Sequence, residues 1–286
     1  NECRNLTSVY ITDLAAWCDI DFANDKSNPL FYSDALYLNG ELLEGEVAIP
    51  SGVSVIPMYA FGCHNITSVI IPYGVTEIGD FAFNYSKNLT SVTIPDSVVT
   101  IGISAFSHCY NLTEVIVPDS VTTIGEDAFY KCSSLKNITL SKNLTAIAEE
   151  TFSSCSSLET ITIPGSVKNI GRFAFEYCTS LADINFCEGV ESVGYCAFYN
   201  CTSLTSVVFP DGMQSIGTFA FESCRNLNSI TIPDSVTYLS YSSFYNTAYY
   251  HDLKNIDKGC LYINNHLLNV NSQNVGECEI REGTKT

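Results

Sequence analysis

Basic residues, long hydrophobic runs and histidines are all scarce in this sequence, and each scarcity excludes a class of function. Lys and Arg number 13 against 31 Asp and Glu, which gives a formal net charge of −18 over 286 residues. Because phosphate binding depends on Lys and Arg displacing counterions, a main role in binding nucleic acid or an anionic membrane surface is excluded. No apolar run approaches the roughly 18 residues that span a bilayer, so no membrane insertion is expected.

Residue patterns typical of enzymes are also missing. The sequence contains no G-x-S-x-G, H-E-x-x-H or glycine-rich phosphate loop, and it has only four histidines. His108 stands at a repeat position that later repeats fill with Lys, Ser, Tyr and Asn, which indicates an interchangeable surface site. The neighbouring Cys109 falls at a core position, so a reactive Cys–His pair is not expected. The sequence therefore predicts neither enzymatic activity nor a cofactor.

Repetition is what the chain has in abundance. Residues 88–110 read NLTSVTIPDSVVTIGISAFSHCY, and the residues that follow begin NLTEVIVPDSVTTIGEDAFYKC. The recurring pattern is Cys-x-x-Leu-x-x-Val-x-Ile-Pro-x-x-Val-x-x-Ile-Gly-x-x-Ala-Phe, with a period of 23 residues. Its phenylalanine occurs at Phe61, Phe83, Phe106, Phe129, Phe152, Phe175, Phe198, Phe221 and Phe244.

One copy predicts one coil of a solenoid. The alternation in residues 92–94 is typical of a half-buried strand, and Pro95 ends that strand because proline cannot donate to a ladder. Residues 98–101 predict a second short strand, Gly102 a sharp bend, and Ala105–Phe106 a helical or 3-10 turn. Such a coil cannot bury its apolar side alone. Nine stacked coils, about 4.8 Å apart, would bury a continuous column.

This pattern resembles the leucine-rich repeats of the BspA-like (treponemal-type) surface proteins. The resemblance covers residues 44–244 copy by copy, and its Ile-Gly-x-x-Ala-Phe-x-x-Cys signature is specific. It implies a right-handed, curved leucine-rich repeat solenoid with short parallel strands on the concave face. It also implies display at the cell surface or outside the cell, and a role in adhesion or partner binding.

Irregular segments flank the repeats at both ends. Residues 1–43 are expected to hold a partial coil and an insert that ends in a β-hairpin, because Asn39-Gly40 stands between alternating apolar runs. Residues 44–248 would form the nine-coil solenoid. Residues 249–286 repeat the design, with a hairpin turn at Asn264-Asn265 and a further coil starting at Gly276. No signal-peptide pattern opens the chain and it stops inside this new coil, so we expect a fragment of a longer protein.

The chain contains 13 cysteines. Eight of them stand three residues before the repeat leucine, or its equivalent: Cys3, Cys63, Cys109, Cys132, Cys155, Cys178, Cys201 and Cys224. Stacking in register would hold their Cβ atoms about 4.8 Å apart, and a disulfide needs about 3.8 Å, so we predict a column of buried thiols. The alternative is a partial set of disulfides, favoured among Cys18, Cys187, Cys196, Cys260 and Cys278. No C-x₂-C spacing supports a zinc site.

Acidic residues recur at the position after the repeat proline. Asp96 and Asp119 stand there in successive copies, and Glu188, Asp211 and Asp234 follow in later ones. Turn formation is their expected role. A calcium site along Glu188, Asp211 and Asp234 is the alternative, because this edge would be rich in carboxylate oxygens. No other metal site is expected.

The residue between the two apolar positions of each strand should point outward and form the candidate binding surface. This column reads Tyr10, Ile70, Thr93, Ile116, Thr139, Thr162, Asn185, Val208 and Thr231. A β-branched, uncharged surface suits a protein or glycan partner, although such residues are also simply good strand formers.

The sequence thus predicts a monomeric, non-catalytic recognition module that binds an extracellular protein or glycan. The alternative is a structural spacer within a larger surface protein.

Overall fold

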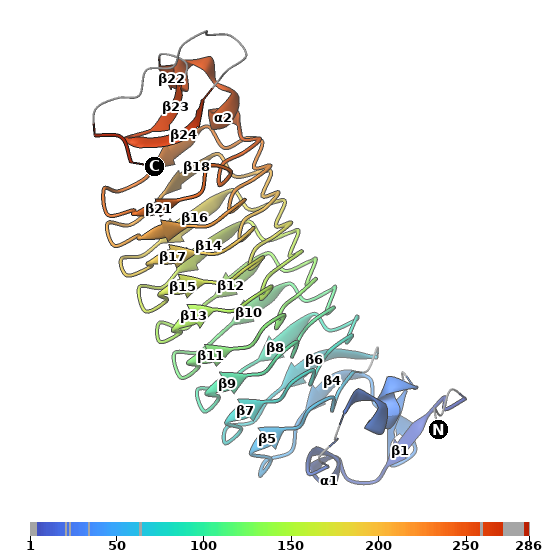
Figure 1. Ribbon diagram of the computed structural model, residues 1–286. Helices are drawn as coiled ribbons and strands as arrows, with labels where there is room; N and C mark the ends of the chain where they lie inside the picture. The colour runs from blue at the N-terminus through green and yellow to red at the C-terminus, as the bar shows by residue number, and fades with distance from the viewer. Residues whose placement is uncertain are drawn as a thin grey trace.

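The computed structural model describes residues 5–20, 22, 24–33, 35–62, 65–257, 260–270 and 283–285. These residues form an elongated solenoid whose coils stack along one axis, with the N-terminal segment at one end and the C-terminal segment at the other (Figure 1). Each regular coil contributes one longer and one shorter parallel strand, and equivalent residues of neighbouring coils pair at an offset of 23, as Glu114 does with Asn137. The predicted period and solenoid are confirmed.

The longer strands form one face, here called the long-strand face. They are β4 Gly45–Ala48, β6 Ile66–Ile70, β8 Ser91–Thr93, β10 Glu114–Ile116, β12 Asn137–Thr139, β14 Thr160–Ile163, β16 Asp183–Phe186, β18 Ser206–Val208 and β20 Ser229–Thr231. Their hydrogen-bonded pairing divides into three groups, β4 to β12, β14 with β16, and β18 with β20. The strands of this face therefore lie side by side, but the ladder of hydrogen bonds between them is interrupted in two places. One of these interruptions lies between β12 and β14.

The shorter strands form a second face. They are β5 Val55–Ile56, β7 Glu77–Ile78, β9 Thr100–Ile101, β11 Thr123–Ile124, β13 Ala146–Ile147, β15 Asn169–Ile170, β17 Ser192–Val193, β19 Ser215–Ile216 and β21 Tyr238–Leu239. In each of these two-residue strands, the second residue is apolar, is more buried than the first and faces the core, as Ile101 and Ile124 do. The expected second strand at residues 98–101 is confirmed at its last two residues.

The repeat phenylalanines form a stacked column through the core. All nine, from Phe61 to Phe244, have no exposed side-chain surface. Neighbouring rings lie 4.9 to 5.5 Å apart between centroids and are close to parallel, with interplanar angles of 3° to 19°. Because each ring covers the face of the next, no coil buries its phenylalanine without its neighbours.

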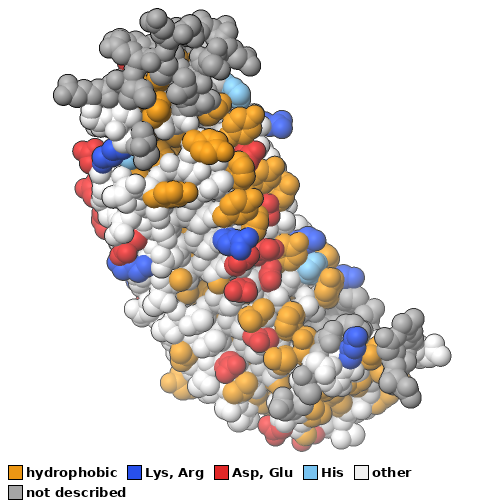
Figure 2. Space-filling model, in the orientation of Figure 1, with side chains coloured by type: hydrophobic (Ala, Val, Ile, Leu, Met, Phe, Trp, Pro, Cys, Tyr) orange, Lys and Arg blue, Asp and Glu red, His pale blue; other side chains and the backbone are white. Residues whose placement is uncertain are grey.

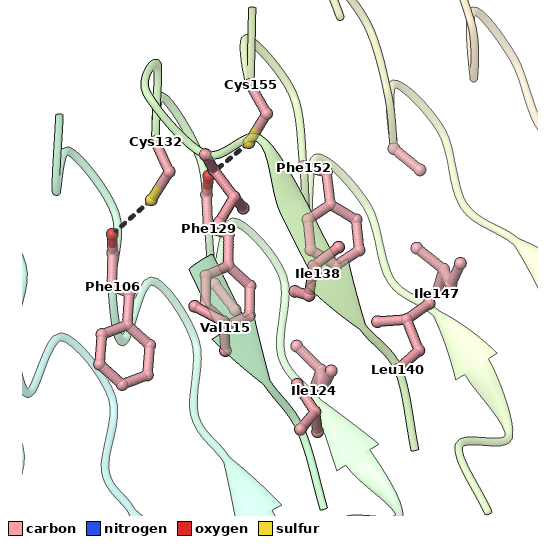
Figure 3. Close-up of a cluster of buried hydrophobic side chains, with 14 of the residues drawn as sticks. Phe106, Val115, Ile124, Phe129, Cys132, Ile138, Leu140, Ile147, Phe152 and Cys155 are labelled. Carbon is pink, nitrogen blue, oxygen red and sulfur yellow. Dashed lines mark hydrogen bonds between the residues drawn. The ribbon is translucent and has the colours of Figure 1, made fainter. Parts of the chain in front are cut away.

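The column cysteines are free thiols with a hydrogen-bonding role that the sequence did not reveal. In the part of the column that the structure describes, each Sγ donates to the carbonyl oxygen of the phenylalanine one coil earlier. The Cys132 Sγ donates to the Phe106 oxygen at 3.1 Å, and Figure 3 marks this bond with a dashed line. Ser86 occupies the same repeat position and makes the same bond to Phe61, at 2.6 Å. The position therefore selects a small side chain that can donate to a buried carbonyl. Cys3 and Cys63 lie outside the described residues.

The phenylalanine segment folds as consecutive turns and not as the helical or 3-10 turn that we expected. The residues two before and two after the phenylalanine take positive φ, as Ser104 at 53° and His108 at 60° do, and none of them is glycine. This backbone cannot continue a helix. It directs alternate N–H groups to the next coil instead, so that His108 N donates to Tyr130 O at 2.8 Å. Bonding between coils replaces bonding within a helix.

The repeat glycine serves close packing and not the sharp bend predicted for it. Gly102 and Gly125 have no positive φ, but a Cβ on Gly125 would lie 2.6 Å from the Ile103 nitrogen and 2.7 Å from the Gly102 carbonyl carbon. Backbone atoms of the preceding coil occupy that space, so no side chain fits.

Both chain ends carry the expected hairpins. At the N-terminal end, β1 Val9–Ile11 pairs in parallel with β2 Leu36–Leu38, which turns back into β3 Glu41–Leu42 through Asn39-Gly40. The segment between β1 and β2 contains α1 Leu14–Cys18, η1 Asp25–Ser27 and η2 Pro29–Phe31. Trp17 fixes this insert to the first coil, because its Nε1 donates to Ala60 O at 2.9 Å.

The C-terminal segment covers the other end of the core. It contains α2 Ala248–His251, η3 Leu253–Asn255, β22 Ile256–Asp257, β23 Cys260–Ile263 and β24 His266–Val270. All four residues of β23 are buried, and Asn264 Nδ2 donates to Ile232 O of the last regular coil at 2.6 Å. The further coil predicted at Gly276 lies outside the described residues. No helix among the described residues combines the length and hydropathy needed to cross a membrane.

Replacing Gly125 with alanine should destabilise the protein by about 1–3 kcal/mol, because the new methyl group would overlap backbone that cannot move away. Gly212→Ala is the matched control, since a Cβ there meets only the Val190 oxygen at 4.0 Å. Urea denaturation followed by circular dichroism measures both changes. Equal effects of the two substitutions would contradict the packing role.

Candidate functional site

Eight of the nine predicted binding residues form one exposed column on the long-strand face. The solvent-exposed members are Ile70, Thr93, Ile116, Thr139, Thr162, Asn185, Val208 and Thr231, and the residue before each of them is buried. Registered pairs such as Ile116 with Thr139 and Thr162 with Asn185 place them side by side. Ile116 and Val208 are 62% and 60% exposed, which is high for large aliphatic side chains. The column is therefore an accessible surface without charge.

Tyr10 does not join this column. Its strand β1 pairs with β2, where Tyr10 stands opposite Tyr37, and the two rings stack at 4.6 Å in a separate three-stranded sheet. Ala48 on β4 lies beside Ile70 instead, so it is the first member of the column. The alternation Val47-Ala48-Ile49 in the sequence was the signal that could have identified it.

A groove of about 660 Å³ opens on this face at the interruption between β12 and β14. Its volume is within the range of about 300–1,000 Å³ that is typical of ligand pockets. It is lined by Asn137, Ile138, Thr139, Leu140, Lys142, Thr160, Thr162, Pro164, Gly165 and Cys187. Two predicted binding residues, Thr139 and Thr162, thus contribute to one concave site.

Two residues that line the groove differ from the repeat pattern. Gly165 stands where most other coils have an acidic residue, and Cys187 stands where they have proline. A Cβ on Gly165 would overlap the backbone oxygen of Glu188, so the two coils approach closely beneath the groove. Hydroxyl groups and one amide provide hydrogen-bonding capacity along its rim, and Lys142 is its only charged lining residue.

The carboxylates after the repeat proline lie on separate coils. Among the described residues, no group of three or more His, Cys, Asp or Glu side chains is arranged to hold a metal ion. Glu188, Asp211 and Asp234 are each exposed on separate coils, and they do not converge. Lys142 interrupts the acidic edge by pairing with Asp119, with Nζ 3.1 Å from Oδ2.

The cysteines divide into three groups. Burial raises the pKa of Cys109, Cys132, Cys178 and Cys201, and raises that of Cys155 to about 12, which leaves these column thiols protonated and unreactive. Cys18 and Cys196 are free and buried, and Cys187 is free and partly exposed beside the groove. Cys260 is disulfide-bonded, as the alternative prediction of a partial set of disulfides among the off-column cysteines allowed. Cys278 lies outside the described residues.

Acidic side chains gather on the turn side, away from the groove. Burial, followed by repulsion from Glu126 and Glu149, raises the pKa of Asp127. Burial, followed by repulsion from Asp127 and Glu149, raises the pKa of Glu150. The folded protein therefore favours the protonated form of both groups.

Alkylation should distinguish Cys187 from the column cysteines. We expect iodoacetamide to modify Cys187 in the native protein, because it is partly exposed, and to leave Cys132 and Cys155 unmodified until the chain unfolds. Peptide mass spectrometry at increasing reaction times measures each site. Modification of Cys132 as fast as Cys187 under native conditions would show that the column is open.

The double substitution Asp127→Asn and Glu150→Gln should stabilise the protein most at neutral pH. Folding raises the pKa of both carboxyl groups. Such a group adds to the stability of the folded protein at a pH below its pKa in the unfolded chain, and this contribution is lost as the pH rises through its pKa in the folded protein. The stability advantage of the double variant should therefore shrink as the pH falls from about 7.5 to about 4.5. Urea denaturation at both pH values tests this, and a growing advantage on acidification would contradict the assignment.

Comparison with known proteins agrees with this architecture. The family model of the BspA type leucine rich repeat region, which contains six copies of the repeat, matches residues 54–182 and 168–283. A search of curated protein sequences finds no match. The crystal structure of the T. pallidum leucine rich repeat protein is similar, with 31% identity, a TM-score of 0.54 and coverage of 62% of this chain and 85% of that one.

A leucine rich cell surface protein from Faecalibacterium prausnitzii is also similar, with 26% identity and a TM-score of 0.47, covering 84% of this chain and 76% of that one. The two family matches together extend from residue 54 to residue 283, well over half of the 286 residues. Their boundaries enclose all nine residues of the phenylalanine column, from Phe61 to Phe244, the column cysteines from Cys109 to Cys224 and the groove. The chain belongs to the BspA-type leucine-rich repeat family.

Proposed function

We propose that this chain is a non-catalytic recognition module that binds an extracellular protein or glycan through its long-strand face. The observation that supports this proposal most directly is that two features lie on the same surface. The exposed, uncharged column from Ile70 to Thr231 runs along the face, and the groove at Thr139 and Thr162 interrupts it. Membership of the leucine-rich repeat family, whose solenoids present extended binding surfaces, supports the same role.

The chemistry of the face favours a partner without strong charge. Side chains in the column are aliphatic, hydroxyl or amide groups, and desolvating them costs less than desolvating ions. The groove adds an anchoring point in which a side chain or sugar ring of the partner would be largely surrounded. Large exposed aliphatic residues such as Ile116 and Val208 would contribute apolar area to the contact.

The disulfide at Cys260 supports a location outside the cytoplasm. Disulfides persist in oxidising surroundings and are rare in cytosolic proteins, where thiols are kept reduced. The described cysteines that remain free in the column are protected by their burial, and the raised pKa of thiols such as Cys155 adds to this protection. A secreted or surface-displayed protein can therefore contain both forms. This location fits recognition of an extracellular partner.

Pull-down from extracellular matrix or mucin preparations tests the proposed function. The double variant Thr139→Arg and Thr162→Arg should lose at least about tenfold in captured material, because two long cations would fill the groove and cover the column. Thr123→Arg with Asn169→Arg adds the same charge to exposed positions on the short-strand face and is the matched control. Equal capture by wild type and both variants would overturn the role of the long-strand face.

A spacer function is the alternative, and the stacked core favours it. Nine phenylalanine rings and the bonds between coils join one end of the rod to the other, so bending requires breaking several contacts at once. Absence of capture by the wild type, in a chain whose unfolding is cooperative, would favour the spacer over recognition.

A further inference from the structure

A cluster of tyrosines, one histidine and two lysines forms a patch on the turn side of the solenoid, away from the long-strand face. Tyr85, His108 and Lys131 occupy the same repeat position in three successive coils, two residues after the phenylalanine. Lys87 and Tyr110 occupy the position four residues after it, and Tyr130 the position one residue after it. The solenoid therefore assembles the patch from three consecutive coils. Figure 2 shows a histidine with hydrophobic and basic side chains around it on one edge of the molecule.

Contacts within the patch hold its rings in place. The Tyr85 and His108 rings stack at 4.2 Å between centroids, and Tyr110 and Tyr130 meet the His108 ring edge-on at 5.7 and 5.3 Å. Lys131 Nζ lies 4.9 Å from the centre of the Tyr130 ring. Tyr85 remains 44% exposed, so the patch is ordered by its own contacts but open to solvent.

The two lysines of the patch contact aromatic rings. Acidic residues outnumber basic ones by 31 to 13, yet neither Lys87 nor Lys131 makes an ion pair with any described residue. Each contacts an aromatic ring instead, Lys87 lying 5.8 Å from the centre of the Tyr85 ring. Burial, followed by the charges of Lys131 and Lys87, lowers the pKa of His108, so the histidine is neutral at pH 7. Two ammonium groups therefore flank the rings.

We propose that this patch binds the acidic end of a glycan, a sugar that carries one carboxylate. Aromatic rings present apolar faces and hydroxyl tips that suit the C–H faces and hydroxyl groups of a sugar ring. The ammonium groups of Lys87 and Lys131 would pair with its carboxylate. The rest of the surface, at a net charge of −18, repels anions and so disfavours binding elsewhere. Two ammonium groups also suit one carboxylate better than a densely charged polymer.

An extended peptide is a poorer fit, because backbone N–H groups in this patch already donate hydrogen bonds to the next coil. Tyr85 N donates to Ser107 O at 2.9 Å, His108 N to Tyr130 O at 2.8 Å and Lys131 N to Ser153 O at 2.9 Å. These bonds between coils leave no free edge at this patch to which a peptide strand could add. Recognition must therefore proceed through side chains alone.

The same chain contains a matched control a few coils away. Tyr177 stands in the column of Tyr85 and is also 44% exposed, and Tyr199 meets its ring edge-on at 5.5 Å. Glu176 and Glu222 stand in the column of Tyr130, beside these tyrosines, so this pair keeps the aromatic geometry but has carboxylates near it. The pair should not bind an anionic sugar.

Titration of the full chain with 3′-sialyllactose, followed by saturation-transfer NMR, tests the proposal. We expect saturation transfer to the sialic acid ring, with at least about tenfold weaker binding of neutral lactose, and weaker binding at high salt because screening reduces the charge contribution. Equal binding of the two sugars would overturn the proposal. So would binding of a tyrosine-sulfated peptide when 3′-sialyllactose does not bind.

Substitutions then locate the site. Lys87→Gln with Lys131→Asn should weaken 3′-sialyllactose binding at least about tenfold, asparagine being chosen because it tolerates the φ of 58° at position 131. Tyr85→Ala should weaken it similarly, and Tyr177→Ala should leave it unchanged. The variant Thr139→Arg with Thr162→Arg should also bind 3′-sialyllactose normally, which separates this site from the long-strand face. Full affinity in the double lysine variant, with circular dichroism unchanged, would overturn the assignment.

Discussion

The stacking of identical coils determines almost every other feature of this molecule. The phenylalanine rings of neighbouring coils lie about 5 Å apart, which is the spacing of paired strands, so one distance serves both the aromatic column and the sheets. At that distance the repeat glycine leaves no room for a Cβ, and the repeat cysteine reaches the phenylalanine carbonyl of the previous coil. These positions are constrained together, because a change at any one of them alters the spacing that the others require.

The constraint on the interior leaves the exterior free to vary. Side chains between the buried positions of a strand meet solvent, and so do most of those two residues after the phenylalanine in the turns. The turn position two residues after the phenylalanine holds Tyr, His, Lys, Ser and Asn in different coils, although all of them take a positive φ. Bonds between coils stabilise that backbone conformation, so even residues that disfavour it are accepted there.

Two surfaces of different character result from this arrangement. The outward column of the long-strand face is uncharged and mostly β-branched, and the groove on this face lies where Gly165 and Cys187 replace the usual turn residues. The turn side carries charged and aromatic side chains, grouped into an acidic cluster at Asp127 and Glu150 and the tyrosine–lysine patch at His108. A rod with separate faces can contact two kinds of partner without competition between them, because neither face shares residues with the other.

The solenoid, its period, the strands, the burial of the phenylalanines and most of the outward column could be predicted from the sequence, since each follows from which positions are apolar and how often they recur. The hairpin at Asn39-Gly40 could be predicted in the same way. Which residues of different coils meet depends on the folded chain. Tyr10 falls outside the column because an insert separates its strand from β4, and the groove and the tyrosine–lysine patch depend on neighbours 23 or more residues away. The fold can be predicted from the repeat because each coil is formed by residues close together in the sequence. The groove and the patch depend on residues that differ between coils and that become neighbours only when the coils stack.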